Sequence, residues 1–279
     1  MILDAEFIEC PRNPLRALHD LKELAKENKC HLIQTPTYSK KWLFLWGGGG
    51  EYQNMIAKKQ RAAGGQVCFL DLGYWGRDKA KTASSFRISF NEFHPNKYLE
   101  IAYGREGNRF AREGISVVSL SRNKGHVLIC GMGRKSRAFY GFDGMEWERK
   151  QVRRIREFMP EHKIYFRPKP HHYEAVEGCV DASSGNIREA LNGAALCVVY
   201  HSNVALDCIS AGIPCIASNG LGALFWPDKY ILPVEVPNPK RRSEFLEACS
   251  WFNWYPREAK LLLEFIRDAE SRIIEISKS

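Results

Sequence analysis

Short apolar runs alternate with amphipathic stretches in the first part of the chain. Leucines recur at near-helical spacing between residues 14 and 28, whereas the run Trp42–Trp46 is continuously apolar and is followed by four glycines. Helical periodicity indicates an amphipathic helix, and a short apolar run indicates a buried strand. We therefore predict helices over residues 14–28 and 51–63 and strands over Trp42–Trp46 and Gln66–Leu72. Between about residues 73 and 103 the pattern is irregular and polar, and it predicts no regular element.

A second alternating series follows residues 121–125. Strands are predicted over residues 126–130, 163–166, 195–200 and 214–217, and helices over residues 145–158, 187–191, 203–211, 243–249 and 256–276. Alternation of this kind is typical of parallel α/β architecture. We therefore predict an α/β fold with two Rossmann-like lobes and a cleft between them. The predicted domains are a first lobe (1–122), a second lobe (123–235) and closing helices (236–279).

Composition narrows the class of protein. The 279 residues are 44% hydrophobic and 26% charged, a balance typical of a globular protein. No apolar run approaches the roughly 20 residues that span a bilayer. The nine cysteines are odd in number and form no CxxC pair, which argues against a disulfide framework or a zinc site. We expect a cytoplasmic protein without a metal.

The formal net charge of +9 bears on partners rather than on the fold. It favours a polyanionic partner such as nucleic acid, a membrane surface or a phosphorylated ligand. A moderately basic but otherwise ordinary soluble protein is the alternative interpretation.

The segment from Cys197 to Ala217 carries the strongest functional signal. A predicted strand ends in His201-Ser202-Asn203, and a helix begins at once. Free N–H groups at a helix start form a ready site for phosphate or hydroxyl groups. We predict that these three residues bind a ligand that carries phosphate or hydroxyl groups; the alternative is a helix capped by Ser202 and Asn203 with no ligand.

Two further turns follow predicted strands. After residues 126–130, Gly131 and Gly133 would let a ligand approach the backbone, and Arg134 and Lys135 would neutralise phosphate. The P-loop spacing is absent, and a solvated basic loop is the alternative.

The second turn reads Arg167-Pro-Lys-Pro-His171. Its prolines stiffen the backbone just past a strand, and we predict that Arg167, Lys169 and His171 contact a diphosphate. A purely structural proline-rich turn is the alternative.

Together with Asp143-Gly-Met-Glu-Trp147 and Val198-Val-Tyr-His-Ser-Asn-Val-Ala-Leu-Asp207, these turns resemble the nucleotide-sugar-binding half of GT-B glycosyltransferases. The likeness extends to capsule and lipopolysaccharide transferases and to related phage-encoded, DNA-modifying transferases. It covers about residues 123–260 and implies that the second lobe (123–235) binds the nucleotide-sugar donor through these turns, while the first lobe (1–122) is on the acceptor side. The family turn usually reads Arg-Pro-His-Pro, so Lys169 is a departure that retains positive charge.

The resemblance implies a metal-independent glycosyltransferase that uses a UDP-, CMP- or other nucleotide-sugar donor and no further cofactor. Transfer needs a general base for the acceptor hydroxyl. Asp71, at the end of a predicted strand, is the first candidate and His94 is the second; capping of the Gly73 turn is the alternative role for Asp71.

The sequence constrains the identity of the acceptor less than it constrains the identity of the donor. Net charge and the phage likeness favour a hydroxylated base in phage DNA, with phosphate contacts from N-terminal basic residues. The predicted acceptor-binding residues are Gly48, Gly49, Arg77, Arg87, Arg105 and Arg109. A bacterial surface glycan, a non-catalytic nucleic-acid-binding protein and a nucleotide-sugar hydrolase or epimerase remain alternatives.

Overall fold

The structure is a computed structural model that describes residues 1–279 except 11–13, 48–49, 77–83, 120–124, 170–174 and 227–235. The chain divides into two compact units. The first unit comprises residues 1–113 and 247–279, and the second comprises residues 114–246. Each unit contains its own mostly parallel sheet, which confirms the α/β prediction.

The first unit has a six-stranded sheet in the order β11-β5-β4-β3-β1-β2. Its strands are β1 Ala5–Ile8, β2 Leu32–Ile33, β3 Trp42–Trp46, β4 Gln66–Leu72, β5 Phe86–Phe90 and β11 Asn253–Trp254. Its helices are α1 Leu15–Glu27, α2 Glu51–Ala62, α9 Ala259–Lys278 and the 3₁₀ helices η1 Asn96–Ala102, η2 Ala111–Glu113 and η3 Pro256–Glu258. The four strands from β4 to β2 are parallel, whereas β5 and β11 are antiparallel to their neighbours.

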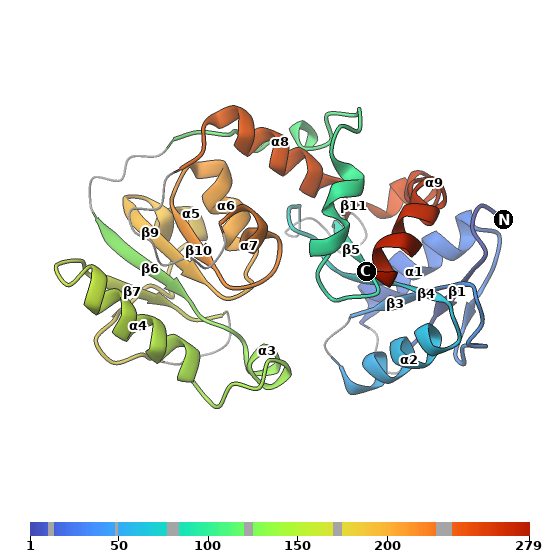
Figure 1. The fold of residues 1–279 in the computed structure, drawn as a ribbon, viewed down its shortest axis with the longest axis horizontal. Helices are drawn as coiled ribbons and strands as arrows, with labels where there is room; N and C mark the ends of the chain where they lie inside the picture. Colours follow the sequence, from blue (N-terminus) through green and yellow to red (C-terminus); the bar gives the residue numbers. More distant parts are fainter. Residues whose placement is uncertain (11–13, 48–49, 77–83, 120–124, 170–174, 227–235) are drawn as a thin grey trace. The chain divides into compact units, whose positions relative to one another are not determined.

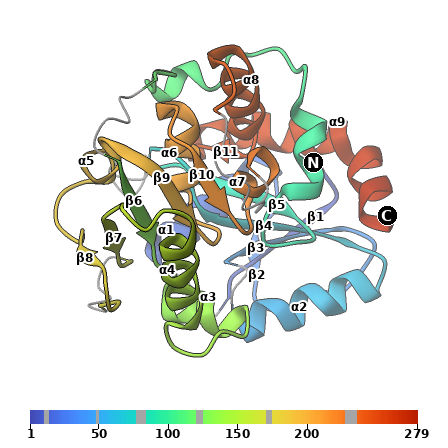
Figure 2. The ribbon, with the colours of Figure 1, turned by 60° about the vertical axis from the view of Figure 1, so that its left-hand side comes forward.

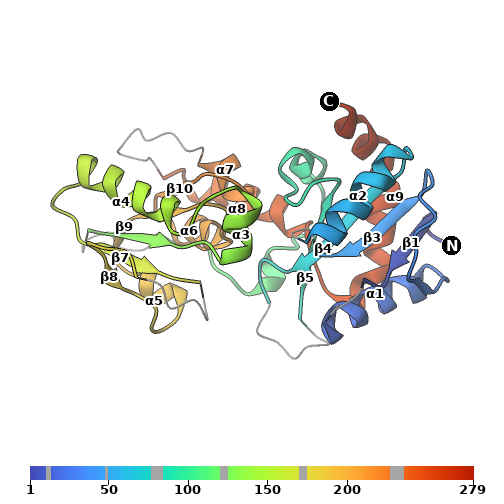
Figure 3. The ribbon, with the colours of Figure 1, turned by 90° about the horizontal axis from the view of Figure 1, so that it is seen from below.

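The order of these strands explains why both faces of the sheet are covered. The step from β1 to β2 runs in one direction along the sheet, and the step from β3 to β4 runs in the other. Because both crossovers are right-handed by rule, α1 and α2 lie on opposite faces (Figure 3). Strand β3 is therefore buried at every residue, which accounts for its unbroken apolar sequence.

The second unit has a five-stranded, all-parallel sheet in the order β10-β9-β6-β7-β8. Its strands are β6 His126–Cys130, β7 Ile164–Arg167, β8 Val180–Asp181, β9 Ala194–Val199 and β10 Cys215–Ala217. Its helices are α3 Arg134–Phe139, α4 Glu146–Phe158, α5 Ile187–Leu191, α6 Val204–Ala211 and α7 Leu221–Phe225, and α8 Pro239–Ser250 leads out of the unit. Helices α4 and α6 cover opposite faces of the sheet (Figures 1 and 2).

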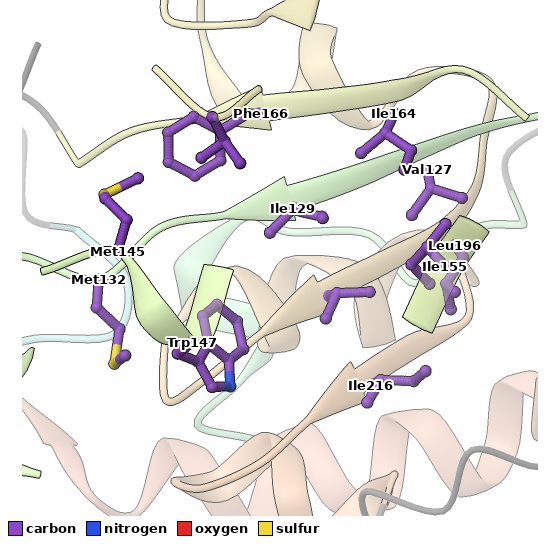
Figure 4. Packing of buried hydrophobic residues seen from close by; sticks show 12 residues of the cluster. Val127, Ile129, Met132, Met145, Trp147, Ile155, Ile164, Phe166, Leu196 and Ile216 are labelled. Atoms are coloured by element: carbon purple, nitrogen blue, oxygen red, sulfur yellow. The ribbon is translucent and has the colours of Figure 1, made fainter. Parts of the chain in front are cut away.

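The core of the second unit forms where α4 packs on the sheet. Trp147 and Ile155 of α4 are buried against Val127 and Ile129 of β6 and Phe166 of β7 (Figure 4). Full burial of such a side chain stabilises a fold by roughly 1.5–3 kcal/mol. This cluster fixes α4 and, with it, the turns at the strand ends.

The C-terminal segment, residues 247–279, belongs to the first unit. Strand β11 pairs antiparallel with β5, and the fully buried Trp254 and Phe252 pack on Phe265 of α9. The sequence instead predicted a separate helical segment over residues 236–279 and a boundary at 122/123. The difference arises because the aromatic residues before α9 complete the first sheet, a long-range pairing that local pattern does not report.

Strand β5 is the main element that the sequence analysis missed. All of its residues are buried, but Arg87 and Ser89 interrupt its apolar pattern. Beyond it, Asn91 adopts the left-handed backbone conformation (φ 55°), which asparagine tolerates better than most residues. Its side chain accepts a hydrogen bond from the Val67 N–H at 2.9 Å, and this anchors the turn that follows β5.

Asp20 provides a test of the packing around α1. Its side chain is fully buried, and neither carboxylate oxygen has a hydrogen-bond partner among the described residues; Arg16 Nε lies 3.8 Å from Oδ2. Burial raises the pKa of Asp20 to about 7, against the smaller lowering effect of Arg16. Because the unfolded chain ionises near 3.8, the contribution of Asp20 to stability is greatest below that pH and is lost as the pH rises towards 7 and above.

We therefore expect Asp20→Asn to stabilise the protein at about pH 8, by on the order of 2 kcal/mol, and to have little effect at about pH 4. Denaturant unfolding at the two pH values measures the difference. Asp268→Asn, at an exposed position of α9, is the matched control. A gain that is equal at both pH values would contradict the ionisation argument.

Candidate functional site

The candidate donor site lies where the sheet of the second unit changes direction. Strands β6, β7 and β8 follow one another to one side, whereas β9 and β10 lie on the other side of β6. In open α/β sheets, ligands bind beyond the carboxyl ends of the strands at such a switch point. The turns after β6 and β9 therefore meet there, and they contain Gly131, Gly133 and His201-Ser202-Asn203.

Hydrogen bonds to β7 and α4 hold the turn after β6 in place. The Gly131 N–H donates to the Arg167 carbonyl at 2.9 Å, and a Cβ at Gly131 would lie 2.7 Å from the Phe166 ring. Only glycine fits this close approach. The Met132 N–H donates to Glu148 Oε1 at 2.9 Å.

Glu148 is itself fully buried and pairs with Arg137, whose Nη2 lies 3.0 Å from the same oxygen. A buried ion pair of this kind fixes geometry because neither partner can leave without stranding a charge. Arg134 and Lys135, in the first turn of α3, are exposed and lie directly after the anchored turn.

The turn after β9 leads directly into α6. Ser202 Oγ accepts a hydrogen bond from the Val204 N–H at 3.3 Å, whereas Asn203, at the cap position, makes no side-chain cap bond. Of the two predicted capping residues, Ser202 therefore supplies the cap and Asn203 does not. The His201 ring lies 5.4 Å from the Tyr140 ring, centroid to centroid.

The sequence analysis missed a third turn at this edge. After β10, residues 218–220 lead into α7, and the Asn219 N–H donates to the Tyr200 carbonyl at 2.6 Å. A Cβ at Gly220 would lie 3.4 Å from the His201 carbonyl oxygen. The signal was available, because Ser-Asn-Gly between an apolar run and a helix repeats the arrangement found after β9.

Arg167 has a different role from the one predicted. Its guanidinium donates to the carbonyls of Ala182, Ser184 and Gly185 at 2.6, 3.0 and 2.8 Å. Its terminal nitrogens thus hold the turn between β8 and α5 rather than pointing to a phosphate. Lys169 is exposed beyond β7, and His171 lies outside the described residues.

A pocket of about 290 Å³ lies beside β7 and β8. It is lined by Phe166, Pro168, Ala175, Val176, Cys179, Asp181 and Ser183. Among the described residues, none of the predicted donor residues lines it.

The two candidate bases of the first unit lie around one buried arginine. Asp71 and Arg87 face each other across β4 and β5, and Arg87 Nη2 lies 3.0 Å from Asp71 Oδ2. Arg87 Nη1 lies 3.3 Å from His94 Nδ1. The structure therefore brings together Asp71, Arg87 and His94, which the sequence analysis had assigned to two separate roles.

The acceptor role predicted for Arg109 is not supported. Arg109 is buried, donates to the Ser250 and Asn253 carbonyls and lies 3.4 Å from Glu258. Burial lowers the pKa of Arg109 to about 10. The guanidinium lies 3.7 Å from the centre of the Trp254 ring, within the packing that joins the chain end to the first unit.

Arg105 is also engaged in packing. Its Nε donates to the Ile101 carbonyl at 2.9 Å, and its guanidinium lies over the Phe265 ring at 4.7 Å. The remaining predicted acceptor residues, Gly48, Gly49 and Arg77, lie outside the described residues.

One group of three metal-ligating side chains occurs in the described part of the chain. The sulfurs of Cys197, Cys208 and Cys215 lie within 4.8 Å of one another, but all three residues are buried in the core between β9, β10 and α6. Burial raises the pKa of Cys208, which favours its protonated thiol. Among the described helices, none has the length and apolar character needed to cross a bilayer.

Comparisons with known proteins find similar structures but no sequence match. No family model and no curated protein matches the sequence. The structure is similar to the Thermosulfurimonas dismutans KpsC beta Kdo 2,7 transferase, with a TM-score of 0.57 and 15% identity over 93% of this chain and 98% of that chain. It is also similar to the beta Kdo 2,4 transferase of the same organism's KpsC, with a TM-score of 0.59 and 12% identity over 98% of each chain. At these identities the likeness establishes the fold alone.

The anchoring role of Glu148 can be tested by unfolding. We expect Glu148→Ala to destabilise the protein by about 3–5 kcal/mol, because it removes the carboxylate that pairs with the buried Arg137 and accepts the Met132 N–H. Glu146→Ala is the matched control: this residue is exposed in the same turn of α4, and its loss should change stability by less than about 0.5 kcal/mol. Equal losses for the two variants in denaturant unfolding would refute the anchoring role.

Proposed function

We propose that this chain is a glycosyltransferase that moves a sugar from a nucleotide-sugar donor to a bacterial surface glycan in the cytoplasm. Kdo is the sugar proposed, because both similar structures are Kdo transferases by name. The likeness extends over nearly the whole of this chain and of both neighbours, so the proposal concerns a two-unit fold of the GT-B type.

One observation carries the proposal. Three strand-to-helix turns, after β6, β9 and β10, gather at the switch point of the second sheet, and each ends at the start of a helix. In α/β proteins, backbone N–H groups at helix starts of this kind point toward a ligand beyond the strand ends. Such groups bind phosphate without the desolvation cost of a buried cation. A donor phosphate would lie against Ser202 and the start of α6, with Gly131 and Gly133 allowing close approach.

Cations at the same edge of the sheet would neutralise the negative charge that develops on the leaving phosphate. Arg134 and Lys135 are exposed in the first turn of α3, and Lys169 is exposed beyond β7. Fixed N–H dipoles and cations stabilise developing negative charge in a transition state. In this proposal they replace a divalent ion.

The acceptor hydroxyl must lose a proton during transfer. In the proposal, the group that receives it belongs to the first unit and comes from the cluster around Arg87. This assignment gives the two units the complementary roles of acceptor and donor binding.

A surface glycan is now preferred to DNA as the acceptor. The DNA interpretation depended on a basic surface in the first unit, but Arg109 is buried and Arg105 packs on an aromatic ring. Both similar structures are named as transferases of a sugar rather than as DNA-modifying enzymes.

Donor binding is expected to depend on Ser202. Among CMP-, UDP- and GDP-linked sugars, CMP-Kdo included, we expect one donor to raise the melting temperature of the wild-type protein. Ser202→Leu should remove that shift, because the larger side chain occupies the space in front of α6 and removes the cap. Ser277→Leu, exposed near the end of α9, is the control and should retain the shift. A Ser202→Leu variant with unchanged donor stabilisation would locate the site elsewhere.

Transfer is expected to continue without divalent cations. If fixed N–H groups and lysine or arginine side chains neutralise the leaving phosphate, then excess EDTA should leave the transfer rate within about twofold of the untreated rate. Product formation from the donor found in the binding screen measures this. Loss of activity that returns on adding Mg²⁺ or Mn²⁺ would contradict the mechanism.

A further inference from the structure

Arg87 lies between the two side chains that are candidates for the general base. Its Nη2 contacts Asp71 Oδ2 at 3.0 Å, and its Nη1 contacts His94 Nδ1 at 3.3 Å. The chemistry of this arginine therefore decides which of its two neighbours is able to take a proton.

The guanidinium is fixed in position. Nη1 also donates to the Phe93 carbonyl at 3.3 Å, and the guanidinium carbon lies 4.5 Å from the centre of the Phe93 ring. The residue is only 6% exposed. Burial acts to lower the pKa of Arg87, but Asp71 and Tyr74 more than offset this, so the group stays charged.

The turn after β5 places His94 against this arginine. Asn91, held by the Val67 N–H, reverses the chain, and the Phe93 carbonyl accepts from both Arg87 and Ser89. The position of the imidazole is thus set by backbone anchors on both sides of the turn.

A charged guanidinium has donors and no acceptor. The nitrogen that it contacts on His94 must therefore be unprotonated, which leaves the proton of the neutral imidazole on Nε2. Protonation of Nδ1 would remove the hydrogen bond and place two cations 3.3 Å apart. Neither nitrogen of His94 is then ready to accept a proton.

Asp71, unlike His94, has oxygen lone pairs that can accept a proton from an acceptor hydroxyl. Its Oδ1 accepts the Leu72 N–H at 2.8 Å and its Oδ2 accepts from Arg87, and each carboxylate oxygen keeps a second acceptor direction. Its side chain is 30% exposed, so a hydroxyl can reach it. Burial raises the pKa of the nearby Tyr74 phenol to about 12, which excludes that group as a base near neutral pH.

We infer that Asp71 is the catalytic base of the proposed transfer and that Arg87 and His94 are positioning residues. The inference rests on the proposed function. In a direct displacement, the acceptor O–H bond breaks and its proton passes to a carboxylate oxygen of Asp71. The hydroxyl oxygen bonds to the anomeric carbon of the sugar, and the bond to the donor phosphate breaks with its electron pair leaving on the phosphate.

The first test is independent of activity. Imidazole ¹⁵N shifts, assigned by comparison with His94→Gln, report which ring nitrogen carries the proton. We expect His94 to be neutral with Nδ1 unprotonated near neutral pH. In Arg87→Leu, provided that it folds, this preference should be lost. A wild-type His94 with a proton on Nδ1 would overturn the inference, whether or not the protein is a transferase.

The second test uses transfer activity. Asp71→Asn should lower kcat by roughly 10²–10⁴-fold while the donor still stabilises the protein against heat. His94→Gln, which keeps a donor near the position of Nε2, should retain activity within about tenfold. The reverse order, with Asp71→Asn active and His94→Gln inactive, would overturn the inference.

A failure of the proposed function can be distinguished from a failure of the inference about Asp71 and His94. If wild-type protein transfers no sugar from any donor, the proposed function fails, while the tautomer measurement still stands or falls by itself. Donor-induced stabilisation of Asp71→Asn shows that a loss of kcat is not a loss of folding.

Discussion

Both units depend on the right-handed crossover that joins parallel strands. Because strands joined in this way run parallel, their carboxyl ends and the starts of the helices that follow them lie at one edge of the sheet. This arrangement explains how Gly131 and Ser202, which are far apart in the chain, come to line the same switch point. The chemistry of the candidate site is therefore set by strand order before any individual side chain is considered.

The second feature is the use of buried and half-buried arginines to hold irregular backbone. The buried Arg137 pairs with Glu148 beside the turn after β6, and the half-buried Arg167 holds the turn after β8. Arg242, almost completely buried, donates to the Ile209 and Ser210 carbonyls at the end of α6 and to the Val118 carbonyl. Arg109 joins the chain end to the first unit. Part of the net charge of +9 thus serves the fold rather than an anionic partner.

This use of charge changes the interpretation of the acceptor. A basic composition suggested a nucleic-acid surface, but a guanidinium that is already bonded to carbonyls and carboxylates has few donors left for phosphate. The same reasoning separates Arg87 from the exposed cations: it organises Asp71 and His94 instead of meeting a ligand directly. What remains exposed at the switch point, Arg134 and Lys135 above all, suits a small phosphorylated donor.

The sequence by itself determined the alternation of elements, the α/β class and the turns after β6 and β9, because these follow from local periodicity and from glycine and cap residues. It did not reveal β5, since Arg87 and Ser89 break the apolar pattern of a strand that is nevertheless buried. Only the tertiary structure shows that β11 and α9 belong to the first unit, and which arginines are packed in the interior and which are exposed. Those outcomes depend on contacts between residues distant in the chain, and a one-dimensional pattern of hydrophobic and charged positions carries no information about which partner each residue meets.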